Sequence, residues 1–576
     1  MKRIFITNII LLLCLTCIAA SPGIEPRLLD EINRMGDDEK VKVNILMAEQ
    51  SDATKLICTG RFYPNKQEHR QLVVETLKRQ AFDSQLELMS LLEEMESNGM
   101  VDDIRSFWIV NAVSCMAKKT AILDLAAHND ILSIGFCEQA LWIFENEAVA
   151  SSKGDGREIT ENLLQVNAPR VWEQGYTGQG VLVAIIDTGV NYNHADLAGR
   201  LWDGGIEYPY HGYDFSSNDN NPIDPHGHGT HVAGTLCGTG ASGSQTGIAP
   251  SATIMALKVF NDYGEGDETM WMAAVQFALE HGVDVINMSL GRPMADATQK
   301  LIIRQACDNI LAAGIVAAVC AGNIRQLQYM APVPDNIYTP GACPPPSLHE
   351  EQLINPGGTS CVISVGAVDY NDSLAPFSSE GPSQWMDVPK YSDYPYTAGS
   401  TTEIGLIRPD ICAPGVQIKS LDYNNINGYT LMDGTSMATP LVTGTIALML
   451  SKDPELTPAQ IDEILERTAI PLSDHKDNDF GSGRLDALAA INAVVVDAIG
   501  ETEQQQALIY PNPSTNSVTI VHEGMKQIEI YTVDGKKVRN IDVDADSYQM
   551  KGLGSGVYVI RISTTHSTLT QKIVIL

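Results

Sequence analysis

The sequence predicts an α/β fold in which a doubly wound parallel sheet carries helices on both faces, with a smaller domain at each end of the chain. Residues 181–186 form an unbroken apolar run that ends at Asp187, as expected for a parallel strand buried on both faces. Residues 437–450 are apolar and rich in small residues, which predicts a central buried helix with Pro440 tolerated in its first turn. The segments before and after this region have shorter patterns, which predict a small α+β domain and a C-terminal β-sandwich. A length of 576 residues is enough for three to four domains.

The first 20 residues have the layout of a secretory signal peptide. Two basic residues precede an apolar stretch from residue 4 to about 18, and small residues follow it. This stretch is shorter than the roughly 20 residues that cross a bilayer comfortably. A lipoprotein modified at Cys17 is an alternative interpretation. We expect export through the periplasm to a secreted or cell-surface location, with no membrane span.

The segment from residue 24 to 150 alternates strand and helix patterns, which predicts a small α+β domain. We expect strands at 41–47, 106–116 and 131–137 and helices at 67–98 and 118–128. Residues 145–160 are polar and predict a linker and cleavage zone before the main domain at 160–497.

The last segment, 507–576, has the pattern of an all-β domain. Short strands are expected at 517–521, 527–533 and 556–562, with a hairpin turn at Asp534-Gly535. The stretch 497–506 is acidic and rich in glutamine, which predicts a linker.

Charge and cysteine content restrict the classes of partner. The net charge of −33 argues against nucleic acid and anionic membrane surfaces as partners. Of the eleven cysteines, Cys343 and Cys361 flank a proline-rich insertion and are one candidate disulfide. Buried free thiols account for Cys307, Cys320 and Cys412 at least as well.

Three short blocks carry Asp187, His228 and Ser436 in that order, and a fourth carries Asn323. A serine hydroxyl becomes a good nucleophile only when a base removes its proton, and a third group must hold that base in one tautomer. The side-chain amide of Asn323 offers a donor to the oxyanion that such an attack creates. These residue types in this order predict a hydrolytic site.

Over roughly residues 160–495, these blocks resemble the subtilisin-like serine peptidases, or subtilases. They read VAIIDTG at 183–189, HGHGTHVAG at 226–234, AGN at 321–323 and GTSMATP at 434–440. The resemblance implies a secreted serine endopeptidase with Asp187, His228 and Ser436 as its triad and Asn323 in the oxyanion hole. No cofactor is required for that chemistry, and the substrates are proteins or peptides.

The same resemblance assigns roles to the neighbouring residues. His228 is the base because it is the first histidine of the HGTHVAG pattern. His231 is then expected in the interior and His226 in a loop beside the cleft. The stretch Ser289-Leu290-Gly291 resembles the family's substrate-binding edge, to which an extended peptide pairs as a strand.

Both ends of the chain resemble accessory domains. Position and pattern make 24–150 similar to the inhibitory propeptide of subtilases, so the enzyme's own propeptide is an expected partner. The region 507–576 resembles the C-terminal sorting domain of the type IX secretion system of Bacteroidetes, which implies the secretion machinery as a partner. The alternatives are a permanent regulatory domain at the N-terminus and a carbohydrate- or cell-binding module at the C-terminus.

Metal binding and a rival function are left open by the sequence. Structural Ca²⁺ is an option in this family, and Asp196 matches a ligand position in some members. Asp214, Asp219 and Asp224 are expected to form an acidic surface loop instead of a site. The alternative function is a catalytically silent, subtilase-fold adhesin or binding protein. A lipase or esterase is disfavoured because the Ser436 block lacks the second glycine of a nucleophile elbow.

Overall fold

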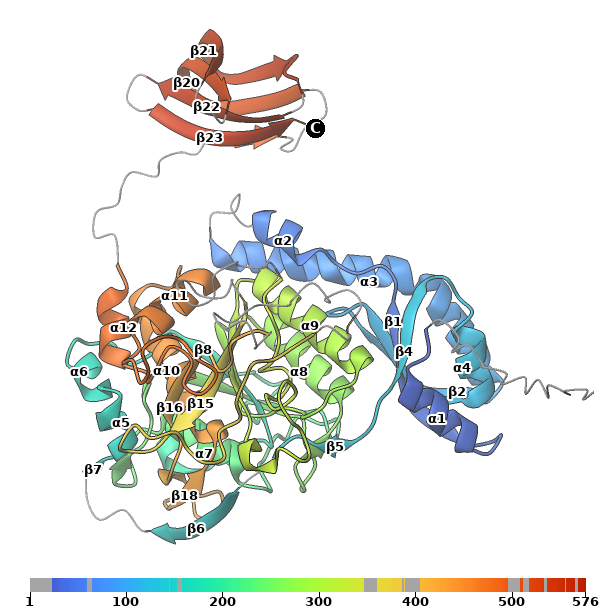
Figure 1. Ribbon diagram of the computed structural model, residues 1–576, viewed down its shortest axis with the longest axis vertical. Coiled ribbons are helices and arrows are strands. Elements are labelled where there is room, and N and C mark those ends of the chain that lie inside the picture. The colour runs from blue at the N-terminus through green and yellow to red at the C-terminus, as the bar shows by residue number, and fades with distance from the viewer. Residues whose placement is uncertain are drawn as a thin grey trace, which may run out of the picture. The chain divides into compact units, whose positions relative to one another are not determined.

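The computed structural model divides the chain into two compact units, residues 1–494 and 495–576 (Figure 1). The described residues are 23–575 apart from 60–64, 144–145, 153–157, 347–359, 386–387, 389–404, 496–507, 511–516, 533–535, 555 and 565–567. The expected signal peptide lies outside them. Among the described helices, none has the length and apolarity needed to cross a bilayer.

The first unit is built on a seven-stranded sheet in the order β16-β15-β14-β13-β8-β11-β9. The strands are β8 (Leu182–Asp187), β9 (Gly212–Asp214), β11 (Thr253–Lys258), β13 (Val285–Met288), β14 (Val316–Cys320), β15 (Val362–Val368) and β16 (Ile411–Pro414). Every neighbouring pair is parallel, which confirms the predicted doubly wound sheet. Strand β8 lies between β11 and β13, where the strand order reverses, and working groups collect at the carboxyl end of such a strand.

Helices cover both faces of the sheet, and both faces of β8 are accordingly apolar. Val183 and Ile185 belong to one apolar core, whereas Ala184 and Ile186 belong to a second core on the opposite face. Helices α7 and α10 contribute to the first core, and α8 and α9 to the second. Their bounds are α7 (His228–Cys237), α8 (Glu268–Glu280), α9 (Ala297–Ala312) and α10 (Thr435–Lys452). The predicted buried helix at 437–450 is therefore confirmed as α10, but the helix begins earlier, at Thr435, so Pro440 lies inside it and not in its first turn as expected.

The N-terminal segment forms a four-stranded antiparallel sheet in the order β2-β3-β1-β4 with helices packed on it. Its elements are α1 (Pro26–Arg34), β1 (Lys40–Met47), α2 (Ala53–Thr59), α3 (Lys66–Ser97), β2 (Val101–Phe107), β3 (Ala112–Lys118), α4 (Lys119–Leu125) and β4 (Ile131–Phe136). The single strand expected at 106–116 is wrong, because the chain turns between β2 and β3. Asn111 adopts a φ of 43° there, and its amide donates to Glu49 O at 2.6 Å.

This segment shares the second core of the main domain. Val73 and Phe107 belong to the same apolar cluster as Trp271 of α8 and Ile302 of α9. Two short ladders continue the association: β5 (Ala140–Leu141) pairs with β12 (Glu265–Gly266), and β6 (Asn146–Ser152) with β18 (Tyr429–Asp433). Figure 1 shows β6 beside β18, the strand that leads into α10.

Shorter elements complete the first unit. They are β7 (Glu158–Ile159), α5 (Glu161–Gln165), α6 (Ala168–Trp172), a 3-10 turn at Ala195–Leu197, β10 (Ser244–Gln245), a 3-10 turn at Arg325–Leu327, β17 (Ile418–Leu421), α11 (Pro458–Thr468) and α12 (Ala487–Ala493).

The C-terminal unit is an antiparallel β domain, as expected, and its described strands form one sheet of five. They are β19 (Leu508–Tyr510), β20 (Ser517–Thr532), β21 (Lys537–Lys551), β22 (Gly556–Thr564) and β23 (Thr568–Ile575). The separate strands expected at 517–521 and 527–533 are one long strand with irregular pairing near Met525. The hairpin turn expected at Asp534-Gly535 lies outside the described residues. A small core that includes Ile520, Ile528 and Ile560 holds this sheet.

Cys343 and Cys361 are separate buried thiols, so the candidate disulfide is absent from the structure. Cys307, Cys320 and Cys412 are also buried free thiols, in line with the alternative drawn from the sequence.

Candidate active site

Asp187 and His228 form a buried hydrogen-bonded pair. Asp187 is the last residue of β8, and His228 is the first residue of α7. The distance from His228 Nδ1 to Asp187 Oδ1 is 2.7 Å, and the two side chains are 1% and 0% exposed. Gly229 permits this approach, because a Cβ there would lie 2.1 Å from Gly189 O. A carboxylate at Nδ1 holds the imidazole in the tautomer that leaves Nε2 as the basic nitrogen.

Thr188 and Asp224 fix this pair in place, a role that was not predicted for either residue. Thr188 Oγ1 donates to Asp224 Oδ1 and accepts from Gly229 N, both at 2.9 Å. Asp224 also accepts from the backbone N–H groups of His226 and Gly227 at 2.9 Å, so it organises the turn that begins α7. No local signal in the sequence marks Asp224 for this role, because the N-cap position of α7 is Gly227.

The prediction of an acidic surface loop is therefore wrong for two of its three aspartates. Asp214 and Asp224 are each 4% exposed, whereas Asp219 lies on the surface. Asp214 is buried because Lys258 Nζ lies 3.1 Å from its carboxylate and neutralises it.

Ser436 is the second residue of α10, and its side chain lies at the carboxyl end of β13. Its Oγ donates to Ser289 O at 3.2 Å, while Ser289 Oγ donates to Ser436 O at 2.8 Å. Helix α10 packs against α7, the helix that begins at His228. A helix N-terminus favours negative charge, because its free N–H groups and dipole point at the site.

Asn323 lies beside the same helix terminus and is held by Thr435. Asn323 Oδ1 accepts from both Thr435 N and Thr435 Oγ1 at 2.9 Å. Because the carbonyl oxygen of the amide is used in this way, its Nδ2 faces the Gly434 side. The arrangement places an amide donor next to the N-terminus of α10.

The thiol of Cys320 lies beside the hydroxyls of Ser436 and Thr435. Cys320 is 2% exposed, and burial raises the pKa of its thiol to about 12. A neutral thiol at this depth has no nucleophilic role, so Cys320 acts as a small packing residue, as the sequence indicated.

The two other histidines of the segment have different surroundings. His231 is 0% exposed, its Nε2 lies 2.9 Å from Ile418 O, and burial lowers its pKa to about 3. His226 lies near Gly264 and the N-terminal segment, since a Cβ added to Gly264 would be 3.6 Å from both His226 Nε2 and Ile143 Cβ.

The stretch Ser289-Leu290-Gly291 directly follows β13 and contacts the N-terminal segment. Gly291 N donates to Trp142 O at 3.1 Å. On the other side of that segment, Trp142 N donates to Gly264 O at 3.3 Å, one residue before β12. Two main-chain edges of the main domain therefore hold a short extended piece of chain between them.

Asp196, the residue considered for calcium, is buried and hydrogen-bonded within the protein. Its Oδ1 accepts from Ser242 N at 2.6 Å and its Oδ2 from Tyr429 Oη at 2.9 Å, and the residue is 0% exposed. Both carboxylate oxygens are therefore occupied by protein donors. No group of three or more His, Cys, Asp or Glu side chains is placed to hold a metal ion in the part of the chain that the structure describes.

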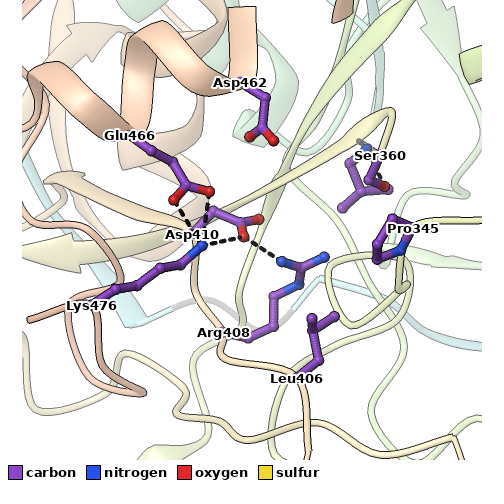
Figure 2. A pocket seen from close by; sticks show the side chains of 9 residues that line it. Pro345, Ser360, Leu406, Arg408, Asp410, Asp462, Glu466 and Lys476 are labelled. Atoms are coloured by element: carbon purple, nitrogen blue, oxygen red, sulfur yellow. Dashed lines mark hydrogen bonds and ion pairs between the residues drawn. The ribbon is translucent and has the colours of Figure 1, made fainter. Parts of the chain in front are cut away.

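A small cavity lies away from these residues and is lined by an ionic cluster (Figure 2). Its lining is Pro345, Ser360, Val362, Leu406, Arg408, Asp410, Asp462, Glu466 and Lys476. Lys476 Nζ lies 2.8 Å from Glu466 and 3.5 Å from Asp410, which also pairs with Arg408. Three carboxylates thus share two cations, and no dashed line joins Asp462 to the other residues drawn. This cluster joins α11 to the end of the sheet and is structural.

Replacing Asp462 by asparagine is expected to stabilise the protein at neutral and alkaline pH. Burial, followed by the charges of Glu466 and Asp410, raises the pKa of Asp462 well above its ordinary 3.8. Because the carboxyl pKa is raised in the folded state, ionisation of this group favours the unfolded state. The resulting loss of stability is absent below pH 3.8 and grows as the pH rises above that value. We expect a gain of about 1–2 kcal/mol at pH 8.

Thermal unfolding at pH 4 and pH 8 measures this effect. The matched control is Glu466→Gln, which removes the partner of Lys476 and should destabilise the fold by about 3 kcal/mol. An Asp462→Asn protein with the wild-type Tm at pH 8 would contradict the account.

The arrangement as a whole has the parts of a nucleophilic hydrolase. It combines a hydroxyl at a helix N-terminus, an imidazole oriented by a buried carboxylate, an amide donor and an edge that holds extended chain.

Comparison with known proteins also indicates a hydrolase. Residues 178–488 match the model of the subtilase family, and residues 508–576 match a secretion system C-terminal sorting domain. The chain is 31% identical to subtilisin E of Bacillus subtilis (strain 168) over 398 residues, which are 69% of this chain and 84% of that protein. It is 30% identical to bacillopeptidase F of the same organism over 476 residues, 76% of this chain but only 29% of that protein.

A crystal structure of a cold adapted subtilisin-like serine proteinase is also similar, with 28% identity, a TM-score of 0.39 and coverage of 54% of this chain and 90% of that one. The sorting domain implies export to the exterior or the cell surface. The family match covers more than half of the chain, together with relatives at 30% identity or more. The chain therefore belongs to the subtilase family and is a subtilisin-like serine protease.

Proposed function

We propose that this protein is a secreted serine endopeptidase in which Ser436 attacks the scissile carbonyl, His228 acts as general base and then general acid, and Asp187 orients the imidazole. The observation that carries the proposal is the 2.7 Å hydrogen bond between His228 Nδ1 and Asp187 Oδ1. That bond fixes the tautomer in which Nε2 can take the proton of a serine hydroxyl. After collapse of the tetrahedral intermediate, water enters and the same imidazole activates it to release the acyl group.

Asn323 is the side-chain donor of the proposed oxyanion hole, and the backbone N–H of Ser436 is the second donor. The two hydrogen bonds from Thr435 to Asn323 Oδ1 support this role, since they orient the amide before a substrate arrives. Preorganised donors stabilise the developing charge without a cost of reorganisation during the reaction.

The proposed substrate edge is Ser289-Leu290-Gly291. The hydrogen bond from Gly291 N to Trp142 O supports it, because an extended substrate would accept the same bond. Ser289 also holds the first turn of α10 through its contacts with Ser436. Peptide bonds in proteins are the proposed substrates.

The region 24–150 is the proposed inhibitory propeptide of the domain at 160–497. Pairing of β5 with β12 and of β6 with β18 supports this role, because both ladders lie next to the proposed catalytic elements. A sheet with many non-local parallel contacts folds slowly, and a partner that forms early lowers that barrier. The region 507–576 directs the protein to the type IX secretion machinery after passage through the periplasm.

Labelling with a serine-directed fluorophosphonate tests the function. We expect one covalent label on the secreted wild-type protein and none on Ser436→Ala, because only a serine beside a working base reacts at a measurable rate. Ser289→Ala is not a suitable control, since it touches Ser436; Ser451→Ala in the last turn of α10 is the matched variant and should keep the label. Secreted wild-type protein without label would favour the rival hypothesis of a silent adhesin.

Processing at the two ends is tested separately. N-terminal sequencing of the secreted protein is expected to give a start within or beyond 145–160, and a start before residue 60 would contradict the propeptide. Truncation after residue 500 should leave the protein inside the cell envelope. Unaltered export of the truncated chain would instead favour the binding-module hypothesis for the last domain.

A further inference from the structure

The N-terminal segment enters the cleft as an extended chain from Glu138 to Trp142. Leu141 lies opposite Glu265 and Ala140 opposite Gly266 in the β5–β12 ladder, and Gly291 N donates to Trp142 O. These main-chain contacts are independent of sequence. Selectivity for one peptide sequence over another must therefore come from side-chain contacts. Two side chains of this stretch make contacts that depend on the type of residue.

The first is the indole of Trp142. It is 1% exposed, and its ring centroid lies 6.3 Å from that of Phe260, which follows β11. Both residues belong to the apolar core shared with α8. A buried aromatic side chain of this size removes 150–250 Å² from water, as a rough general figure, and is a typical anchor of a bound peptide.

The second is the carboxylate of Glu138, which Arg292 contacts. Arg292 follows Gly291 directly; its Nη2 lies 3.3 Å from Glu138 Oε2, and its Nη1 lies 3.3 Å from Glu138 O. Arg292 is 6% exposed, and its backbone exchanges hydrogen bonds with Thr339 at 2.9 and 3.0 Å. The guanidinium is thus held at the edge of the cleft on a rigid backbone.

Glu268 positions the guanidinium from beneath. It is the first residue of α8 and 0% exposed, and its Oε1 accepts from Arg292 Nη1 at 3.0 Å. The hydrogen bond to Glu268 holds one side of the guanidinium fork, although burial raises the pKa of Glu268 to about 7, and the other side of the fork stays directed at Glu138. Arg27 also pairs with Glu138, at 2.7 Å, but Arg27 is part of the N-terminal segment and leaves the cleft when that segment is removed.

We propose that Arg292, positioned by Glu268, is a specificity-determining residue that recognises an acidic side chain four positions before a large aromatic one in the bound polypeptide. The proposal rests on the endopeptidase function above and deepens it. The N-terminal segment occupies the cleft through Glu138 and Trp142. Protein substrates of the mature enzyme carry the same pair of residues on the N-terminal side of the bond that is cut.

Peptide cleavage by the mature enzyme tests the proposal. The probe is an internally quenched peptide with the sequence of residues 136–152, compared with the same peptide carrying Glu138→Gln. We expect kcat/KM of the wild-type enzyme to be about fivefold to tenfold higher for the glutamate peptide, as for one charge-assisted hydrogen bond. In Arg292→Gln this ratio should fall to about one, and Arg292→Lys should give an intermediate ratio because it keeps the charge but loses the planar fork.

A third peptide, with Trp142→Ala, should be cleaved at least about tenfold more slowly by every variant. Equal kcat/KM of the wild-type enzyme for the peptides with and without the Glu138→Gln change would overturn the role of Arg292. That comparison needs no enzyme variant, so it holds even if a substitution impairs folding. An enzyme that takes the fluorophosphonate label but discriminates neither change contradicts only this proposal, whereas an enzyme that takes no label contradicts the endopeptidase function itself.

Discussion

Replacing His228 by alanine is expected to lower kcat for peptide hydrolysis by about 10⁶-fold, the magnitude established for the corresponding histidine of subtilisin. In the proposed mechanism the imidazole has two tasks, because it removes the proton of Ser436 and later delivers a proton to the leaving amine. Its buried hydrogen bond with Asp187 orients it for both of them. KM should change little, since the substrate edge at Gly291 is untouched.

Single-turnover and steady-state kinetics on a quenched peptide measure this effect. The matched control is His231→Gln, because His231 is buried nearby and bonds to the main-chain oxygen of Ile418. The control should lower stability but keep most of kcat in the folded protein. A His228→Ala enzyme within about tenfold of wild type would show that another group is the base.

Replacing Asp187 by asparagine is expected to lower kcat by about 10⁴-fold while the fold is kept. The amide fits the same space, but its NH₂ group cannot accept the hydrogen bond that the carboxylate accepts from His228 Nδ1 at 2.7 Å. The imidazole then takes the wrong tautomer and Nε2 no longer serves as a base. The remaining rate comes from the oxyanion donors and substrate binding.

Activity and Tm should be measured together for Asp187→Asn. Asp224→Asn is the informative comparison, since Asp224 supports the turn before His228 through the backbone of His226 and Gly227. We expect Asp224→Asn to lower Tm by more than Asp187→Asn does and to lower kcat by less. The opposite order would assign the main orienting role to Asp224.

Asp187 and Ser436 could be placed from the sequence because short stretches of neighbouring residues mark a strand end and a helix start. Asp187 ends an apolar run and Ser436 begins a run of small apolar residues, and both patterns depend only on neighbouring residues. The strand end and the helix start then follow from the general geometry of doubly wound sheets. For the same reason the α/β class and the antiparallel C-terminal domain could be derived before any coordinates.

Features that depend on distant partners could not be predicted. Asp214 is buried because Lys258 lies against it, 44 positions along the chain, and nothing near Asp214 in the sequence indicates that partner. The contacts of Glu138 with Arg292 join residues 154 positions apart. Such pairings are set by the register between strands and segments far apart in the chain, which residue patterns in one segment do not contain.

The turn that divides 106–116 into two strands was missed for another physical reason. Its residues are mostly apolar, because Ile109 and Val110 are buried against α9 and not because they continue a strand. Burial in tertiary contacts and burial in a strand give the same apolar signal.

The apolar core that Val73 and Phe107 share with α8 and α9 bears on how long the enzyme lasts after secretion. If the N-terminal segment is removed as proposed, an unfolded enzyme molecule has lost the chain that completes this core. The lifetime of the mature protein is then set by the height of its unfolding barrier instead of its free energy of unfolding. We expect its half-life at high temperature to depend on interactions that break late in unfolding, and each molecule to unfold only once.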